Sequence, residues 1–512
     1  MVDTSSAIPT LPIDIPDDAK MYRIDTFSAD DYCDSSARRC LEDKYYPLLH
    51  VSPTVNRRSA SFQFNKRARV HNWLKYKEGF SADLVDRLLD DFGIEAGDTV
   101  LDPFVGSGTT CLVAKMRGIN SVGIDPLPIS KIAISAKQPI LDYSLSELRD
   151  MHDVLVELEV PSGYRGRVHS IPITEGAYSD QTDRALAYVL EWLVTSRFSI
   201  EANNLLSLCM INSLERLSYT AKDGQYLRWD YRSDKVVEAS RRRIENGRAP
   251  AVTILDKGDL PDAIPTIISE FDATLSDIEY VQGHSPNSPS ANIEFVEGSA
   301  LTQLPKLKSD SIDGVITSPP YCNRYDYTRT YALELAFLGL DNDAVKRLRQ
   351  TLLSATVENR SKLDKLEAYY RSINRPKDYE QITKVITECS ALQETVDALN
   401  LRAKNGEINN VGILRMVERY ITELTFIYAE LFRVCKSGVH VVFVNDNVRY
   451  GGEVVPVDYI STALAEALGF TPIKIISLKQ QKGNSTDILP MAEARGFLFH
   501  VTAVVAELRQ QL

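Results

Sequence analysis

The chain has 512 residues, of which 44% are hydrophobic and 25% are charged. This composition excludes wholesale disorder, and the length exceeds what one hydrophobic core usually serves. The formal net charge of -12 excludes a uniformly basic nucleic-acid-binding surface, so any such contact requires a local basic patch.

Residues 1–60 are predicted to form an N-terminal tail and a lead-in to the folded part. Residues 1–18 are acidic and rich in proline, and they lack the basic stretch that begins a secretory signal peptide. The sequence also lacks a run of ~20 apolar residues, which a membrane span would need. Its seven cysteines are scattered, which predicts neither a metal site nor disulfides and favours a reducing cytoplasm.

The segment 61–137 is predicted to hold the first half of an α/β core. A helix is expected to start at Ser81, a good N-cap residue, and to end at Gly93. A strand over 99–102 then enters a glycine-rich turn, followed by a helix over 109–117 and a strand over 121–125. This β-α-β unit predicts a parallel sheet with helices on both faces.

The alternation of strands and helices is then interrupted twice. Residues 138–290 are mostly helical in pattern and end in a Ser/Pro-rich linker, and residues 341–410 form a second polar, helical stretch. Between them, the segment 291–340 returns to the core pattern, with strands over 293–298 and 311–318 and a helix over 330–340.

The last segment, 411–512, completes the predicted core. It begins with a long amphipathic helix to about residue 435, and continues with a strand over 440–445, a helix over 456–468 and strands over 472–479 and 496–507. We therefore predict an α/β fold, in which a Rossmann-like, doubly wound sheet is assembled from three separated pieces and carries two largely helical insertions.

The glycine-rich turn, DPFVGSGTT (102–110), has the features of a ligand-binding loop. Gly106 and Gly108 permit close approach of a ligand to the backbone, and the next helix offers free N–H groups. Asp125 ends the next strand, where a carboxylate can accept hydrogen bonds from ribose hydroxyls. The spacing is not GxGxxG, and Asp102 stands where it could bind an ammonium group. S-adenosylmethionine, an amino acid joined to a nucleoside, fits these features better than a dinucleotide does.

The strand over 311–318 enters the sequence Ser-Pro-Pro-Tyr at the edge of the sheet where such folds place their sites. The prolines fix the backbone and leave carbonyl groups free to accept hydrogen bonds. The exocyclic amine of a nucleobase is a poor nucleophile because its lone pair is delocalised into the ring. Hydrogen bonds from this amine to the Ser318 side chain and the Pro319 carbonyl would pull it toward tetrahedral geometry, and Tyr321 offers a face for a flipped base. Catalysis would then depend mainly on positioning the reacting groups, without a general base.

Together, DPFVGSGTT and TSPPY resemble the cofactor and catalytic motifs of the DNA amino-methyltransferases, which make N4-methylcytosine or N6-methyladenine. The resemblance implies S-adenosylmethionine as cofactor, double-stranded DNA as partner and no metal. It implies the catalytic residues Ser318, Pro319, Pro320 and Tyr321. The cofactor-binding residues that it implies are Phe80, Ser81, Asp102, Phe104, Gly106, Ser107, Gly108, Thr109, Thr110, Asp125 and Ser299.

Two features of the motifs bear on the target. Within the family, Ser at the first position of the catalytic tetrapeptide is associated with cytosine N4, and Asp or Asn is commoner for adenine N6. Ser318 therefore favours N4-methylcytosine, with N6-methyladenine as the alternative. Members with FxGSGTT usually carry the catalytic motif first, and the order here is reversed, which leaves the position of the target-recognition region open.

We expect the insertion at 138–290 to recognise the target, with 341–410 as the competing region. Candidate base or DNA contacts are Arg228 and Trp229 in the first insertion and Asn323, Tyr325 and Tyr327 after the tetrapeptide. A basic, aromatic stretch at 55–77 and a loop at 478–486 are further candidates, for which a solvated surface is the competing interpretation.

The predicted function is site-specific DNA methylation in a restriction–modification or phage-defence setting, with cognate restriction or defence proteins as partners. Two other classes stay open. One is a methyltransferase that acts on RNA or on a protein amide, and the other is a non-catalytic DNA-binding protein that retains the fold.

Overall fold

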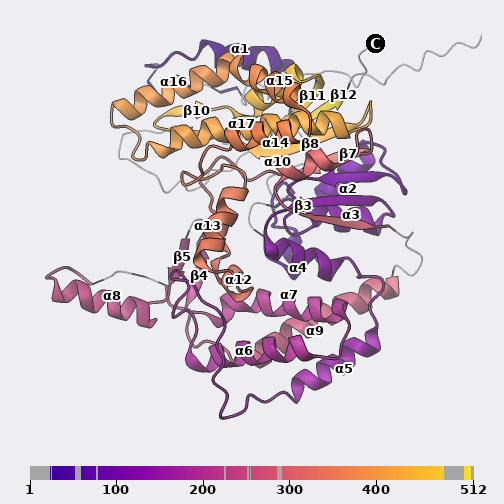
Figure 1. Ribbon diagram of the computed structural model, residues 1–512, viewed down its shortest axis with the longest axis vertical. Coiled ribbons are helices and arrows are strands. Elements are labelled where there is room, and N and C mark those ends of the chain that lie inside the picture. Colours follow the sequence, from indigo (N-terminus) through magenta and orange to yellow (C-terminus); the bar gives the residue numbers. More distant parts are fainter. Residues whose placement is uncertain are drawn as a thin grey trace, which may run out of the picture.

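The computed structural model describes residues 23–51 (without 25 and 31), 59–76, 79–284 (without 224, 225, 251, 252 and 254), 291–477 and 501–508. Figure 1 shows a central sheet between helices, with a further layer of helices below it. Among the described residues, none of the helices combines the length and the apolarity that crossing a bilayer requires. The predicted loop at 478–486 lies outside the described residues, as do residues 55–58 of the basic stretch.

The central sheet has eight strands. From edge to edge they are β1 (Leu49–Val51), β11 (Phe470–Ser477), β12 (Val501–Leu508), β8 (His440–Asp446), β7 (Gly314–Thr317), β2 (Thr99–Asp102), β3 (Asn120–Asp125) and β6 (Ile293–Glu297). The five strands from β8 to β6 are parallel, whereas β12 is antiparallel to both of its neighbours. This arrangement confirms the predicted α/β fold with a doubly wound sheet.

The strand order reverses at β2. In register, Leu101 of β2 lies between Val122 of β3 and Val315 of β7. The chain runs outward from β2 to β3 and β6 on one side, and later from β7 to β8 on the other. Open α/β sheets bind their ligands in the crevice outside the carboxyl ends of the strands at such a reversal. The fold therefore places a site where β2 and β7 end.

Consecutive residues of the central strands pack against opposite helical layers, as the pleat requires. Val100 is buried in a cluster with residues of α2 (Ala82–Asp91) and α3 (Thr109–Met116). Its neighbour Leu101 is buried in a second cluster with α17 (Gly412–Val434). Both faces of the sheet are covered, which explains why these strands are uninterrupted apolar runs.

The first insertion builds a hydrophobic core of its own. Its helices are α5 (Leu145–Val156), α6 (Asp180–Thr195), α7 (Ile200–Leu217) and α9 (Ala263–His284), which pack with the core helix α4 (Pro128–Lys137). The insertion also contains a hairpin, β4 (Thr220–Asp223) with β5 (Tyr226–Trp229), and the helix α8 (Asp234–Glu245). Figure 1 shows α8 projecting away from the rest of the molecule.

The second insertion packs onto the sheet through α17. It consists of α13 (Asn342–Thr351), α14 (Leu363–Ser372), α15 (Pro376–Thr387) and α16 (Ser390–Lys404). Buried residues of α14 to α16 share one cluster with α17 and with α18 (Val457–Ala467). This insertion therefore extends the main core, whereas the first one forms a separate layer.

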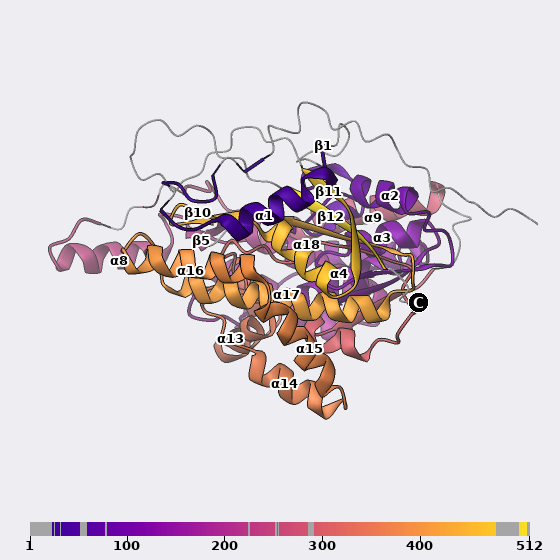
Figure 2. The same ribbon diagram turned by 90° about the horizontal axis from the view of Figure 1, so that it is seen from above.

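The predicted lead-in contains regular structure that the sequence pattern did not suggest. The helix α1 (Ser36–Tyr45) packs against α16 and α18, as Figure 2 shows from above, and β1 extends the sheet beside β11. The buried Arg38 of α1 forms ion pairs with Glu394 of α16 (2.8 Å) and Glu453 of β10 (3.2 Å). The contacts that hold this segment come from the far end of the chain, so local patterns carried no signal for it.

Two other elements differ from prediction. The helix expected over 330–340 is divided into α11 (Tyr327–Thr330) and α12 (Ala332–Phe337) because Asp326 caps a turn that begins earlier. Between β8 and α18, where no strand was predicted, the chain forms a second hairpin of β9 (Val448–Tyr450) and the already mentioned β10 (Glu453–Val455).

Candidate active site

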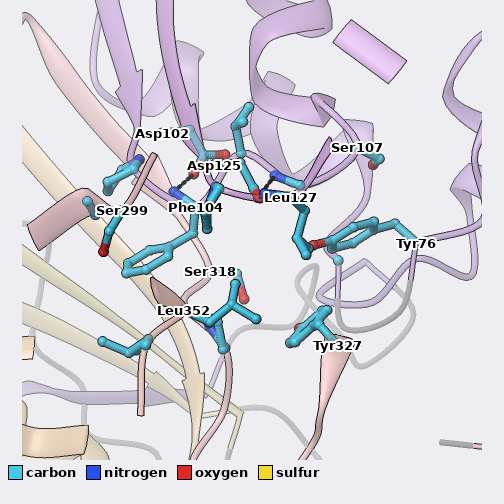
Figure 3. Close-up of a pocket in the computed structure, with 18 of the residues that line it drawn as sticks. Tyr76, Asp102, Phe104, Ser107, Asp125, Leu127, Ser299, Ser318, Tyr327 and Leu352 are labelled. Atoms are coloured by element: carbon cyan, nitrogen blue, oxygen red, sulfur yellow. Dashed lines mark hydrogen bonds between the residues drawn. The ribbon is translucent and has the colours of Figure 1, made fainter. Parts of the chain in front are cut away.

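A cavity of about 690 Å³, open to solvent, lies at the carboxyl ends of β2, β3 and β7, where the strand order reverses. The predicted site residues that line it are Phe80, Asp102, Phe104, Gly106, Ser107, Thr109, Asp125, Ser299, Ser318, Pro320 and Tyr327. The glycine turn and the Ser-Pro-Pro-Tyr segment, about 200 residues apart in the chain, therefore meet at one cavity (Figure 3).

Asp102 connects three elements at the floor of the cavity. Its carboxylate accepts hydrogen bonds from the hydroxyls of Thr317 (2.6 Å) and Thr110 (2.8 Å) and from the backbone N–H of Phe104 (3.1 Å). Burial raises the pKa of Asp102 to about 6, although these hydrogen bonds favour the charged form. One side chain thus joins the end of β2, the start of α3 and the end of β7.

Asp125 holds the glycine turn from the end of β3. One carboxylate oxygen accepts from the backbone N–H of Gly106 (3.1 Å), and the other accepts from that of Leu127 (2.8 Å). Burial raises the pKa of Asp125 to about 7. Each carboxylate oxygen keeps a second acceptor position, so these bonds leave room for ligand hydroxyls.

The charges around the cavity suit a cationic ligand. Among the described residues, no Lys, Arg or His forms an ion pair with Asp102 or Asp125. Figure 3 shows both carboxyl groups on one side of the cavity, with the apolar Phe104 and Leu352 nearby. Buried carboxylates without a partner charge are costly. The ammonium and sulfonium groups of S-adenosylmethionine would compensate them, so the residues present fit this cofactor.

The turn itself requires glycine on two grounds. Gly106 and Gly108 have φ values of +50° and +83°, which L side chains rarely adopt. In addition, a Cβ on Gly106 would lie 2.7 Å from the ring of Tyr76. The Tyr76 ring in turn stacks on Tyr327 and Tyr331, with centroids 5.8 and 5.4 Å apart. This aromatic stack ties the glycine turn to the chain that follows the tetrapeptide.

In the tetrapeptide, Ser318 is oriented by a neighbouring strand. Its hydroxyl donates a hydrogen bond to the Val444 carbonyl of β8 (2.9 Å) and lies 3.4 Å from the Tyr321 hydroxyl. Because its proton is directed at a backbone carbonyl, its lone pairs are left to accept from a ligand. Ser318 and Pro320 line the cavity, whereas Pro319 and Tyr321 do not, and Tyr321 is only 9% exposed.

Three of the predicted cofactor residues support the cavity instead of lining it. The Ser81 hydroxyl accepts from the backbone N–H of Leu84 and so caps α2. Gly108 is the N-cap residue of α3, and Thr110 is buried with its hydroxyl on Asp102. In this structure their contacts are with the protein.

The candidate DNA contacts after the tetrapeptide are mostly internal. Asn323 accepts from the backbone N–H of Tyr325 (3.1 Å) through its side-chain oxygen. Tyr325 and Tyr327 are buried and meet edge to face at 4.9 Å. Tyr325 lines a smaller cavity of about 230 Å³ that shares Pro320 and Tyr327 with the main one.

The hairpin of the first insertion docks beside these tyrosines. β5, which carries Arg228 and Trp229, contacts α11, and the Lys235 ammonium lies 4.4 Å from the Trp229 ring centroid. On β4, Lys222 forms an ion pair with Glu334 of α12. The first insertion is thereby attached to the segment that follows the tetrapeptide.

The described part of the basic, aromatic stretch at 55–77 is largely structural. Trp73 is buried, and its indole N–H donates to Asp277 of α9 (3.0 Å). The same carboxylate forms an ion pair with Arg69 (2.7 Å) and accepts from the backbone N–H of Val70 (3.1 Å). These groups join the stretch to the first insertion.

Sequence reasoning missed two contributors to the site. The buried Asn65 donates to the Phe80 carbonyl (2.9 Å) and the Thr109 hydroxyl (3.3 Å), and accepts from the Ala82 N–H (2.9 Å). It thus clamps the start of α2 to the first residue of α3, where the glycine turn ends. Residues 351–353, at the start of the second insertion, form part of the cavity wall. Neither feature has a local sequence pattern that predicts it.

Comparison with known proteins agrees with this geometry. A family model described as DNA methylase matches residues 28–129. The type II methyltransferase M.BsoBI of Geobacillus stearothermophilus is 49% identical over 465 residues, which cover 91% of each chain. The type II methyltransferase M.AvaI of Anabaena variabilis is 34% identical over 460 residues, 88% of this chain and 89% of that protein. M.MjaII of Methanocaldococcus jannaschii is 36% identical over 80 residues, 16% of this chain and 14% of that protein.

Proposed function

The chain belongs to the DNA amino-methyltransferases, as a site-specific DNA methyltransferase with S-adenosylmethionine as methyl donor, and we propose that it methylates the N4 amine of cytosine. The choice of cytosine rests on Ser318, the residue type that the family associates with N4, and the observation that supports its role as an acceptor is that its proton is bound by the Val444 carbonyl. A hydroxyl held in this way acts as an acceptor, which is what an exocyclic N–H requires. The alternative target is adenine N6.

In this mechanism the residues of the chain mainly position the reacting groups. Ser318 and the Pro319 carbonyl accept the two N–H bonds of the base amine and so direct its lone pair toward the cofactor. Asp102 and Asp125, at the ends of the neighbouring strands β2 and β3, would bind the cationic and hydroxyl groups of the cofactor. S-adenosylmethionine, when bound, supplies an electrophilic methyl group on a positively charged sulfur. The amine gains acidity once methylated and releases its proton to water, so no general base is needed.

For DNA recognition we propose the first insertion, through its hairpin and α8. The helix α8 has no buried residue, and a solitary helix of this length is marginal in water. Arg241 and Arg242 on it are each 69% exposed, and Arg243 and Arg248 follow. Such groups suit contacts to the phosphate backbone of DNA, while β5, which carries Arg228 and Trp229, contacts α11, whose Tyr327 lines the cavity. The second insertion, 341–410, is the competing region.

We further propose that the enzyme acts in the cytoplasm and modifies the sites of a cognate restriction endonuclease. The type II designation of its full-length relatives supports this setting.

The proposed base is tested by incubating the purified protein with S-adenosylmethionine labelled in its methyl group, together with duplex DNA, RNA or no nucleic acid. Labelled duplex DNA is digested to nucleosides and analysed by mass spectrometry. We expect N4-methyldeoxycytidine. Recovery of N6-methyldeoxyadenosine instead would overturn the assignment of the base and leave the fold and the cofactor site unaffected.

A further inference from the structure

Lys137, the last residue of α4, is buried against the glycine turn. Its ammonium group donates a hydrogen bond of 2.8 Å to the backbone carbonyl of Ser107, and the side chain is 1% exposed. Ser107 stands between the two glycines of the turn and lines the cavity. The lysine itself does not line the cavity, so it would act on a ligand through the turn.

The burial of this cation is not explained by a structural ion pair. Among the described residues, Lys137 has no carboxylate within 4.0 Å, and burial lowers its pKa to about 7. Its titratable neighbour is His71, whose own pKa is lowered to about 3 by burial and by the lysine. A buried, unpaired ammonium group is costly to a fold. Because Lys137 is buried beside the turn despite this cost, a functional role at the turn would account for its position.

The electrostatics of the cavity indicate what that function is. The carboxylates of Asp102 and Asp125 suit the cationic and hydroxyl groups of the cofactor, but they repel the carboxylate of its methionine moiety. The N–H groups of Gly106 and Gly108 are bonded to Asp125 and to the Val105 carbonyl, so the positive side of the site is supplied by the N-terminus of α3, which the lysine holds in place through Ser107.

We propose that Lys137 is a positioning residue for cofactor binding, which holds the Ser107 carbonyl and so keeps the glycine turn in place for the methionine moiety. This inference rests on the proposed cofactor site. The bond holds the Ser107 carbonyl against α4 and so fixes the turn beside the N-terminus of α3, whose first N–H groups can face an anionic ligand.

The chain offers a matched control for the loss of a buried lysine. Lys115, on α3, is also buried, and its ammonium group donates to the Ala291 carbonyl at 3.1 Å. Neither Lys115 nor Ala291 lines the cavity. Lys115→Met removes the same kind of bond at a similar depth without touching the turn.

The test is isothermal titration calorimetry of the full chain with two ligands that differ in the methionine moiety. S-adenosylhomocysteine retains it, and 5′-methylthioadenosine lacks its amino and carboxyl groups. In Lys137→Met we expect the Kd for S-adenosylhomocysteine to rise about tenfold, the effect of losing one hydrogen bond that holds the turn, while that for 5′-methylthioadenosine changes less than about twofold. In kinetics, KM for S-adenosylmethionine should rise with little change in kcat.

Lys115→Met should leave both Kd values unchanged. The inference is overturned if Lys137→Met binds S-adenosylhomocysteine like the unmodified protein, or if it weakens both ligands equally. Should Lys137→Met not fold, Lys137→Gln retains a polar side chain without the charge and allows the same comparison. Asp102→Ala separates the two proposals: if it too leaves S-adenosylhomocysteine binding intact, the cofactor site itself is misplaced.

Discussion

The hydroxyl of Thr317 donates a 2.6 Å hydrogen bond to the carboxylate of Asp102, across 215 positions of the chain. Thr317 ends the strand that leads into the catalytic tetrapeptide, and Asp102 ends the strand that leads into the glycine turn. Both residues are buried. This one contact therefore sets the relative position of the two motifs that the proposed methyl transfer brings together.

Replacing Thr317 should uncouple the motifs. In Thr317→Val the hydrogen bond is lost at nearly constant volume, so we expect kcat/KM to fall about tenfold and the melting temperature to fall by a few degrees. Thr425→Val is the control, because the buried hydroxyl of Thr425 bonds within α17 at 2.8 Å. That variant should lose stability but keep its kcat/KM. Equal catalytic losses in both variants would refute a specific role for the Thr317–Asp102 contact.

Catalysis and cofactor binding should be separable by mutation. Pro319→Ala and Tyr321→Ala should abolish methyl transfer, because the first frees the backbone that presents the residue 319 carbonyl and the second removes the ring beside the Ser318 hydroxyl. Both should spare cofactor binding, because neither side chain lines the cavity. Asp102→Ala should instead raise the Kd for S-adenosylmethionine at least about tenfold, since it removes a buried charge opposite a cation. Calorimetry and a tritium-transfer assay on the same preparations provide the comparison. Full turnover in all three variants would show that the site has been assigned to the wrong residues.

Ser318 is expected to contribute through its acceptor lone pairs. Ser318→Ala should lower kcat by about one to two orders of magnitude, the range expected for an interaction made with the reacting amine. KM for the cofactor should change little. Ser213→Ala is a suitable control, since the buried Ser213 hydroxyl bonds within α7 at 2.8 Å. A Ser318→Ala enzyme with unchanged kcat would remove the main support for the proposed arrangement of the amine.

The two buried carboxyl groups predict a pH dependence of stability. Their pKa values, about 6 for Asp102 and about 7 for Asp125, lie above the ordinary 3.8, so the folded protein binds protons that the unfolded chain releases. Their contribution to stability is complete below pH 4 and is lost as the pH rises through 6 and 7.

Cofactor binding should show the opposite trend, because the ionised carboxylates attract its positive groups. The rise in melting temperature on adding S-adenosylmethionine should therefore be larger at pH 8 than at about pH 5.5. Thermal unfolding across this range, with and without the cofactor, measures the difference. A cofactor-induced shift that is the same at both ends would show that these carboxyl groups do not titrate in the free protein.

The arginines of α8 should contribute to DNA binding without affecting chemistry. Changing Arg241, Arg242 and Arg243 together to Gln should raise KM for DNA and reduce the slope of log K against log salt by up to about three, with kcat unchanged. Arg371→Gln on α14, where the arginine is 62% exposed, is a control on the second insertion. If instead the control alone weakened DNA binding, recognition would belong to 341–410.

The sequence alone was sufficient for the core of the fold and for both motifs. The strand over 99–102 coincides with β2, and the predicted long helix corresponds to α17, because strands buried on both faces leave short apolar runs and amphipathic helices leave apolar residues at a period of 3.6. The glycine turn and the tetrapeptide were recognisable because their geometry depends on residue types, glycine and proline, with unusual backbone restrictions.

Tertiary structure alone decided which side chains converge. The burial of Lys137, the clamp made by Asn65 and the joining of β1 to the sheet all depend on partners tens to hundreds of residues away. A side chain's hydrogen bonds and burial are properties of the packed chain, and no local pattern encodes them when the partner is a backbone carbonyl. The sequence thus determined the chemistry that is present, and folding determined which of its groups face the cavity.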